Sequence, residues 1–163
     1  MLALSRGAAA QVAEAIGYNN VQFVDGSIEA LDAPIDDGTP LVADESVDLV
    51  LSNCVLNLVN PSDRERLLAN IRRVLAPGGR VAISDIVCDQ VVPQHLQDDP
   101  DLWSGCISGA WEESAFLDAF RRLGFEQVHY ADRSQDPWRE VEGIEFRAVT
   151  LVGDLPGSSG CCP

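Results

Sequence analysis

The chain has 163 residues, enough for one domain with a sizeable hydrophobic core. Its 26 acidic residues outnumber its 11 basic residues, and the net charge of −15 argues against nucleic acid or an anionic membrane surface as a partner, because both repel a polyanion. No stretch approaches the roughly 20 consecutive apolar residues of a membrane span, and no export signal is evident. We therefore expect a cytoplasmic protein without nucleic-acid or membrane partners.

Apolar periodicity divides the first third of the chain into a helix, a short strand, a loop and a longer strand. Residues 3–16 repeat apolar side chains near helical spacing, and Gly17 is a suitable C-terminal cap. Residues 21–24 (VQFV) predict a short strand, and residues 32–46 predict a loop. Residues 47–52 (VDLVLS) are a nearly continuous apolar run, typical of a strand covered on both faces of a parallel sheet.

The middle of the chain predicts a strand, a helix and a second strand. Asn60 and Pro61 are suitable for the N-cap and the first position of a helix, whose apolar side chains then fall on one face. Residues 77–79 (Pro-Gly-Gly) end this helix, and residues 80–87 (RVAISDIV) predict the next strand. Two parallel strands joined by a helix in this way form a right-handed crossover.

The last part of the chain predicts two helices and two strands. A short helix is expected near residues 101–108, and a clearer one over residues 112–123 that ends at Gly124. Residues 125–131 and 143–152 predict the final strands.

The cysteines are five in number: Cys54, Cys88, Cys106, Cys161 and Cys162. Their spacing is not that of a zinc site, and in a reducing cytoplasm they should be free thiols. The adjacent pair at the C-terminus suits a soft metal or metalloid better than a disulfide. Residues 154–163, which contain that pair, have no core-forming pattern and are expected to be a disordered tail.

A resemblance to a known family rests on motifs in the middle of the chain. The order of strand, helix, LAPGGR, strand and Ser-Asp is similar to that of class I S-adenosylmethionine-dependent methyltransferases. Two segments resemble the arsenite methyltransferases in particular, namely LSNCVLNLVNPSDRERLLANIRRVLAPGGRVAISDI and VPQHLQDDPDLWSGCISGAW. The resemblance covers residues 1–152, so residues 1–153 are expected to form a partial methyltransferase domain.

The resemblance implies an α/β fold, with a partial Rossmann-like class I methyltransferase sheet and an antiparallel C-terminal strand pair. The sheet order of the family is 3-2-1-4-5-7-6, and the resemblance begins after strands 1 and 2, which carry the cofactor-binding Gly-rich loop and acidic residue. Residues 21–24 would then lack a neighbouring strand, and unpaired buried backbone groups cost about 1–3 kcal/mol each. We therefore expect a longer natural protein, direct pairing of residues 21–24 with residues 47–52, or a partner chain that completes the sheet.

By resemblance the protein is an enzyme, an arsenite methyltransferase that moves a methyl group from S-adenosylmethionine to trivalent arsenic, and the missing N-terminal segment would impair it. The substrate would be arsenite or its thiol conjugate, with a thiol as reductant. Cys54 and Cys106 match the cysteines that bind arsenic in the family, and thiolates suit so soft an atom. From chemistry alone, a cysteine after an apolar strand is more often a core residue.

The residues that the resemblance assigns to the cofactor fall in two places. Five of them follow the predicted VQFV strand and would flank the adenine: Asp25, Gly26, Ser27, Ile28 and Glu29. Two more, Ser52 and Asn53, would line the cofactor edge of the sheet. Without the resemblance, the DGSIE stretch would be a turn that ends a strand.

Four other residues near these motifs have either a structural interpretation alone or both a structural and a functional one. Asn57 is expected to fix the loop after the strand, and Asp85 is either a pocket residue or a solvated carboxylate. Trp103 and Trp111 would shield the reacting methyl group or fill the core. Two other functions stay open: a class I methyltransferase fragment acting on another small molecule, and a non-catalytic remnant that binds arsenicals or a partner chain through its thiols.

Overall fold

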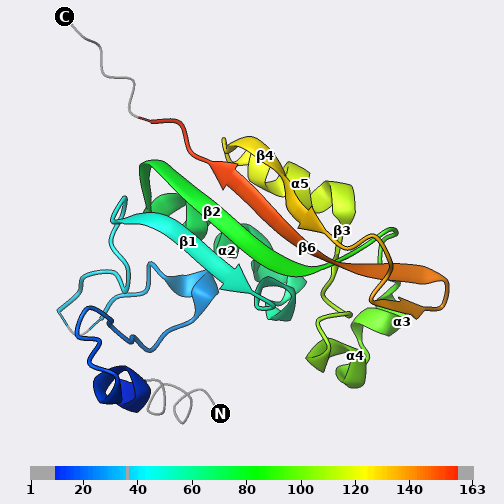
Figure 1. The fold of residues 1–163 in the computed structure, drawn as a ribbon, viewed down its shortest axis with the longest axis horizontal. Coiled ribbons are helices and arrows are strands. Elements are labelled where there is room, and N and C mark those ends of the chain that lie inside the picture. Colours follow the sequence, from blue (N-terminus) through cyan, green and yellow to red (C-terminus); the bar gives the residue numbers. More distant parts are fainter. Residues whose placement is uncertain (1–9, 36, 158–163) are drawn as a thin grey trace, which may run out of the picture.

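One mixed β-sheet crosses the molecule, and helices pack against it (Figure 1). The structure is a computed structural model and describes residues 10–35 and 37–157. The strands are β1 (Val47–Asn53), β2 (Leu75–Cys88), β3 (Trp111–Glu112), β4 (Glu126–Arg133), β5 (Arg139–Val141) and β6 (Ile144–Asp154). The helices, with 3-10 turns marked η, are η1 (Ile28–Ala30), η2 (Leu56–Leu58), η3 (Pro61–Asp63), α2 (Arg64–Val74), α3 (Gln94–Gln97), α4 (Pro100–Ser104) and α5 (Glu113–Arg122).

The main strands lie in the order β1-β2-β6-β4, with β3 paired to β2 and β5 paired to β6. β1 runs parallel to β2, whereas β6 runs antiparallel to both β2 and β4. In the strand numbers of the resemblance, this order is 4-5-7-6 and ends in the expected antiparallel pair. The predicted α/β fold, part of a class I methyltransferase sheet, is therefore confirmed.

The helix predicted after Asn60 is present, but it begins with the 3-10 turn η3. The Asn60 side chain accepts a hydrogen bond from the backbone N–H of Ser62 at 3.0 Å, and Pro61 occupies the first turn. α2 follows this turn and ends where Leu75 begins β2. The second strand therefore starts before the Pro-Gly-Gly segment rather than after it.

α5 confirms the helix predicted over residues 112–123. The Glu112 carboxylate caps its N-terminus by accepting hydrogen bonds from the backbone N–H groups of Ser114 and Ala115, at 3.0 and 2.9 Å. Gly124, with a φ of 85°, ends the helix in the left-handed conformation that a residue without a Cβ adopts readily.

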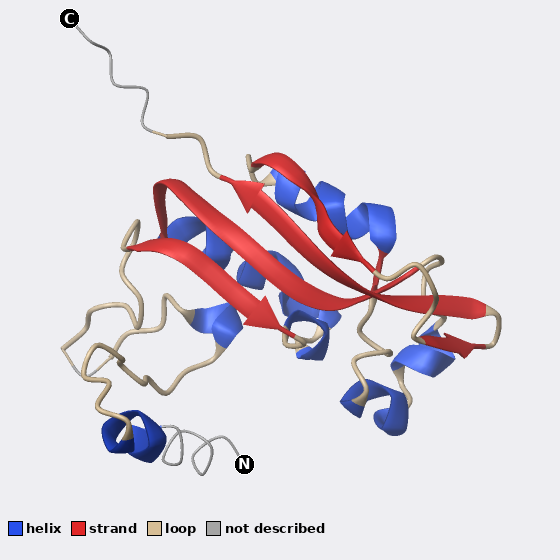
Figure 2. Cartoon of the chain, viewed as in Figure 1, coloured by secondary structure: helices blue, strands red, loops and turns tan. Residues whose placement is uncertain are grey.

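α2 and α5 cover the same face of the sheet, behind the strands in Figure 2, and share one hydrophobic core. Buried members of this core are Leu67, Leu68 and Ile71 of α2, Phe116 and Phe120 of α5, and Val81, Ile83 and Leu151 of the sheet. None of the described helices is long and apolar enough to cross a membrane.

The N-terminal segment differs from its prediction. Residues 10–15 are helical and Gly17, at a φ of 80°, ends the helix as expected, whereas residues 1–9 lie outside the described part of the chain. Residues 21–24 form no strand and do not pair with residues 47–52; the chain here runs as loops and the turn η1 (Figure 2). The strand prediction is wrong because a strand needs a neighbour for its N–H and C=O groups, and within the described residues β1 pairs only with β2.

β1 is the edge strand of the described sheet, and it is not covered on both faces as predicted. Val47 and Val50 pack against the core, whereas Leu49 is 45% exposed and Leu51 is 70% exposed. One face and one edge of the strand are therefore open, although its apolar sequence suits a strand in the interior of a sheet.

The region between β2 and α5 contains two short helices, α3 and α4. α4 covers only the first part of the helix expected at residues 101–108, and the rest is a loop that carries Cys106. The side chains of this region form a second core, in which Leu96, Leu102 and Ile107 are buried.

The C-terminal strands are present as β4 and β6, and the hairpin strand β5 lies between them in sequence. β6 extends to Asp154, and Leu155 is buried in the main core, so folded structure passes the boundary expected at residue 153. Cys161 and Cys162 lie outside the described residues.

Candidate functional site

Two cysteines occupy an uncommon backbone conformation at the edge where β1 and β2 end. Cys54 directly follows β1 with a φ of 53°, and its backbone N–H donates to the carbonyl oxygen of Ser84 in β2 at 2.9 Å. Cys106 follows α4 with a φ of 61°. This left-handed conformation costs a non-glycine residue roughly 1–2 kcal/mol, so the surrounding structure must hold both residues in place.

The two thiols lie together. The Cys106 thiol is 3.7 Å from the carbonyl oxygen of Cys54, and the two thiols are close enough for each to shift the pKa of the other. Both cysteines are free thiols, Cys54 being exposed and Cys106 8% exposed. The structure therefore brings together the two residues that the resemblance singles out as arsenic ligands.

Both thiols are protonated at neutral pH. Burial, with a smaller effect of the Asp85 charge, raises the pKa of Cys106 to about 11. The same two causes raise the pKa of Cys54. Cys88 is buried elsewhere, where its thiol donates to the carbonyl oxygen of Trp111 at 3.2 Å, and burial raises its pKa to about 12.

Asp85 is a buried residue of this site and not a solvated carboxylate. It is 2% exposed, and its carboxylate accepts hydrogen bonds from the backbone N–H groups of Ile86 at 2.9 Å and Asn57 at 3.3 Å. Burial raises the pKa of Asp85, while these backbone hydrogen bonds lower it. The pocket interpretation of Asp85 is therefore the correct one.

Asn57 ties the segment after β1 to both β2 and the Cys106 loop. Its side-chain amide donates to the carbonyl oxygens of Ile86 at 2.7 Å and Cys106 at 3.2 Å. The loop comes so close that a Cβ on Gly109 would lie 1.8 Å from the carbonyl oxygen of Asn57. The expectation that Asn57 fixes the loop after the strand is confirmed, because its hydrogen bonds tie that loop to Asp85 and Ile86 of β2. Its hydrogen bond to the Cys106 loop was not expected, and the sequence gives no sign of the role of Gly109 beyond the run of small residues around it.

A small cavity of about 110 Å³ opens beside Cys54 at the ends of the strands. Its lining residues include Asn53, Cys54, Ser84, Asp85, Asp132 and Thr150. Small-molecule pockets usually measure about 300–1,000 Å³, so the cavity is smaller than a nucleoside cofactor needs. The side chain of Ser52 has a buried hydroxyl with no hydrogen-bond partner among the described residues, which suits a polar ligand next to β1.

The other predicted cofactor residues form a turn that packs on α2. Ser27 donates to the Glu29 carboxylate and thereby lowers its pKa, and the carbonyl oxygen of Glu29 accepts from Asn70 of α2 at 3.1 Å. Ile28 packs against the main core, and a Cβ on Gly26 would lie 2.1 Å from the side chain of Leu41. These contacts fix the turn against α2, and the described part of the chain does not enclose a site for a nucleoside cofactor at this edge.

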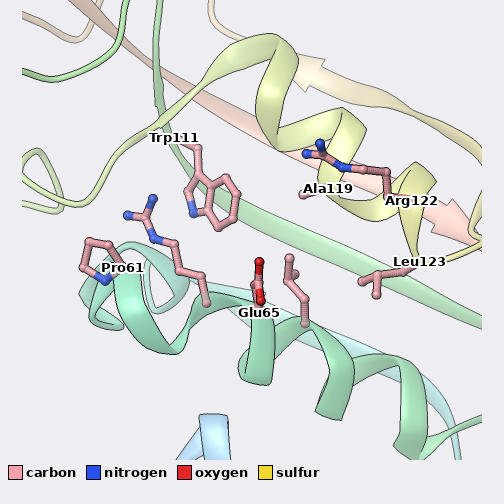
Figure 3. Close-up of a pocket in the computed structure, with 8 residues that line it drawn as sticks. Pro61, Glu65, Trp111, Ala119, Arg122 and Leu123 are labelled. Carbon is pink, nitrogen blue, oxygen red and sulfur yellow. The ribbon is translucent and has the colours of Figure 1, made fainter.

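A larger cavity of about 580 Å³ lies between α2 and α5 (Figure 3), and its lining includes neither Cys54 nor Cys106. Its lining includes Trp111, Glu65 and Arg122. Arg64 stacks on the Trp111 ring at 4.5 Å and donates to the carbonyl oxygen of Gly109 at 2.5 Å. Trp111 therefore lines the cavity between α2 and α5, and Arg64 of α2 holds the Cys106 loop through its hydrogen bond to Gly109.

Comparison with known proteins gives consistent matches. A family model described as a methyltransferase domain matches residues 7–138. The arsenite methyltransferase of Halobacterium salinarum is 44% identical over 94 residues, which is 58% of this chain and 24% of the relative. That of Homo sapiens is 37% identical over 109 residues, which is 66% of this chain and 26% of the relative. The chain thus spans about a quarter of the length of these two curated relatives.

Solved structures agree with the sequence matches. An arsenic(III) S-adenosylmethionine methyltransferase from Chlamydomonas reinhardtii superposes with a TM-score of 0.69 and 31% identity, over 93% of this chain and 50% of that chain. The YcgJ protein of Bacillus subtilis, at a TM-score of 0.63 and 15% identity, shares the fold.

Proposed function

Because the chain belongs to the family of methyltransferase domains, we propose that it is the arsenic-binding part of an S-adenosylmethionine-dependent arsenite methyltransferase. The observation that carries this proposal is the meeting of the Cys54 and Cys106 thiols at the carboxyl ends of β1 and β2. Ligands of open α/β sheets bind at this edge. The matches to arsenite methyltransferases support arsenic over another small acceptor.

The two thiols suit trivalent arsenic in both number and protonation. Arsenous acid exchanges two of its hydroxyl groups for two thiolate sulfurs, and the two thiol protons leave with these hydroxyls as water. Protonated thiols therefore react without a separate base, in keeping with the raised pKa values of Cys54 and Cys106. The residues described include no group of three or more potential metal ligands, so a small thiol reductant would supply a third sulfur to arsenic.

The cysteine pair also prepares arsenic for methyl transfer. Arsenic held by thiolates keeps a lone pair, and S-adenosylmethionine supplies an electrophilic methyl group on a sulfonium sulfur. The pair fixes the position of arsenic. When two reacting groups are both held in place, the activation free energy of the reaction between them falls substantially. Ser52 and Asn53 at the end of β1, with the turn of residues 25–29, would hold one side of the cofactor.

The remaining side of the cofactor site would come from outside the described residues. The open edge of β1 and the exposed side chain of Leu51 suit a further strand, from the same protein or from a partner chain that completes the sheet. Free thiols at the site suit a reducing compartment, so we place the protein in the cytoplasm.

The test is a titration of trivalent arsenic into the chain with Cys161→Ser and Cys162→Ser, so that the tail contributes no thiol. We expect Cys54→Ser and Cys106→Ser each to weaken binding of phenylarsine oxide at least about tenfold, because each leaves one thiol where two acted together. Cys88→Ala serves as the control and should bind like its parent. Unchanged affinity in both serine variants would rule out a shared arsenic site.

A further inference from the structure

We propose that Asn57 is a positioning residue that holds the Cys106 thiol against the Cys54 thiol. Asp85 in turn fixes the backbone of Asn57 by a hydrogen bond. The proposal rests on the proposed function, because it assigns how the same two-thiol site is built. It concerns a residue that touches neither arsenic nor cofactor and acts only through the two cysteines.

The side chain of Asn57 links the Cys106 loop directly to the sheet. It is 1% exposed, and its amide group spans the carbonyl oxygens of Ile86 in β2 and Cys106 in the loop. Both acceptors are carbonyl oxygens, so the nitrogen end of the amide must face them. The two donors on this one nitrogen therefore join the two carbonyls.

The backbone of Asn57 is fixed in turn by a buried charge. Its N–H group donates to the Asp85 carboxylate, which also accepts from the backbone N–H of Ile86. Asp85 therefore sets the turn between Cys54 and Asn57 relative to the end of β2. One network of hydrogen bonds thus connects the turn that carries one thiol with the loop that carries the other.

The two cysteines need such a restraint because both have left-handed backbone conformations. Neither conformation is favourable for a residue with a Cβ, and each relaxes once its surroundings release it. The absence of a Cβ on Gly109 lets the loop approach the carbonyl oxygen of Asn57, but it attracts nothing by itself. The attractive contacts of the loop include the hydrogen bond from the Asn57 side chain to the carbonyl oxygen of Cys106 and the one from Arg64 to the carbonyl oxygen of Gly109. The first of these joins the loop to the segment that follows Cys54.

Loss of these hydrogen bonds should therefore separate the thiols without removing either of them. A separated pair binds a dithiol-specific reagent as two single thiols, because the effective concentration of one thiol at the other falls. The variant Asn57→Leu has nearly the same shape as the parent and lacks both donors. Asn57→Ser is a milder replacement, and Asn60→Ala is the matched control, since it removes an exposed side chain whose hydrogen bonds go to Ser62 in the turn η3.

The experiment uses the full chain with Cys161→Ser and Cys162→Ser. Phenylarsine oxide, which needs two thiols, reports the pair, and iodoacetamide with mass spectrometry reports each thiol singly. Cys88, which is buried in the second core, serves as an internal reporter of folding. We expect Asn57→Leu to bind phenylarsine oxide at least about tenfold more weakly, with Cys106 alkylated faster than in the parent and Cys88 still protected. Asn60→Ala should match the parent in all three measurements.

Two results would overturn the proposal. The first is that Asn57→Leu binds phenylarsine oxide with the affinity of the parent while Cys106→Ser has lost that affinity. This result would show that the two thiols bind arsenic without help from Asn57. The second is rapid alkylation of Cys88 in both Asn57→Leu and Asn57→Ser, which would make Asn57 a support of the whole fold. If Cys54→Ser and Cys106→Ser also keep parental affinity, the proposed function itself fails.

Discussion

At the scale of single residues, the main finding is that both candidate ligands have strained backbones. Cys54 and Cys106 have φ angles of 53° and 61°, whereas asparagine, aspartate or glycine is the usual residue in such a conformation. A cysteine kept there by buried hydrogen bonds suggests a function for its side chain, because a core-filling cysteine has no need of the strain. Burial raises the pKa of both thiols, and the neighbouring Asp85 carboxylate adds a smaller effect in the same direction.

The buried thiol of Cys88 makes the free energy of unfolding depend on pH in the alkaline range. Its pKa is about 12 in the folded chain, against 9.0 for an unperturbed cysteine, so above pH 9 the unfolded chain loses a proton that the folded chain keeps. The folded state then binds more protons, and the free energy of unfolding falls as pH rises. Between about pH 8 and about pH 10 the Cys88 contribution should fall by about 1.4 kcal/mol.

Urea denaturation of the parent and Cys88→Ala at these two pH values checks this expectation. The alanine variant is less stable at both pH values because it leaves a small cavity, but it should lose about 1.4 kcal/mol less than the parent between them. Equal losses in the two proteins would show that the Cys88 thiol ionises as readily in the folded chain as in the unfolded one.

At the scale of elements, the helices and the final strands were predictable because their signals are local. Asn60 and Pro61 mark the start of one helix, and Gly124 marks the end of another. The strand predicted at residues 21–24, which the structure lacks, could not be judged from local signals, because a strand forms only beside a neighbour that is distant in sequence. The left-handed turns at Cys54 and Cys106 were beyond prediction for the same reason, since contacts across the fold impose them.

The β1 edge predicts how the isolated chain behaves in solution. Leu51 is 70% exposed on a strand whose outer edge is unpaired within the described residues, a combination that favours self-association. Leu51→Lys should reduce the concentration-dependent rise in apparent mass by sedimentation velocity and change the free energy of unfolding by less than about 0.5 kcal/mol. Val91→Lys is the matched control, because Val91 is 75% exposed but lies outside the strands. An equal effect of both variants would show that added charge, and not the strand edge, governs association.

At the scale of the whole molecule, the site is assembled from three separate segments. The end of β1 provides Cys54, the end of β2 provides Asp85, and the loop after α4 provides Cys106. The resemblance identified the two cysteines, but only the fold shows that they lie together and that Asn57 and Asp85 connect the segments that carry them. The net charge of −15 does not oppose the proposed substrate, because arsenous acid is uncharged at neutral pH.

The central claim is that one arsenic atom is bound by both thiols, and X-ray absorption at the arsenic K-edge tests it most directly. The sample is the arsenite-loaded chain with Cys161→Ser and Cys162→Ser, in buffer without added thiol. We predict two sulfur neighbours for arsenic in this protein and one in either Cys54→Ser or Cys106→Ser. A spectrum with only oxygen neighbours, or a sulfur count that neither substitution lowers, would contradict the account.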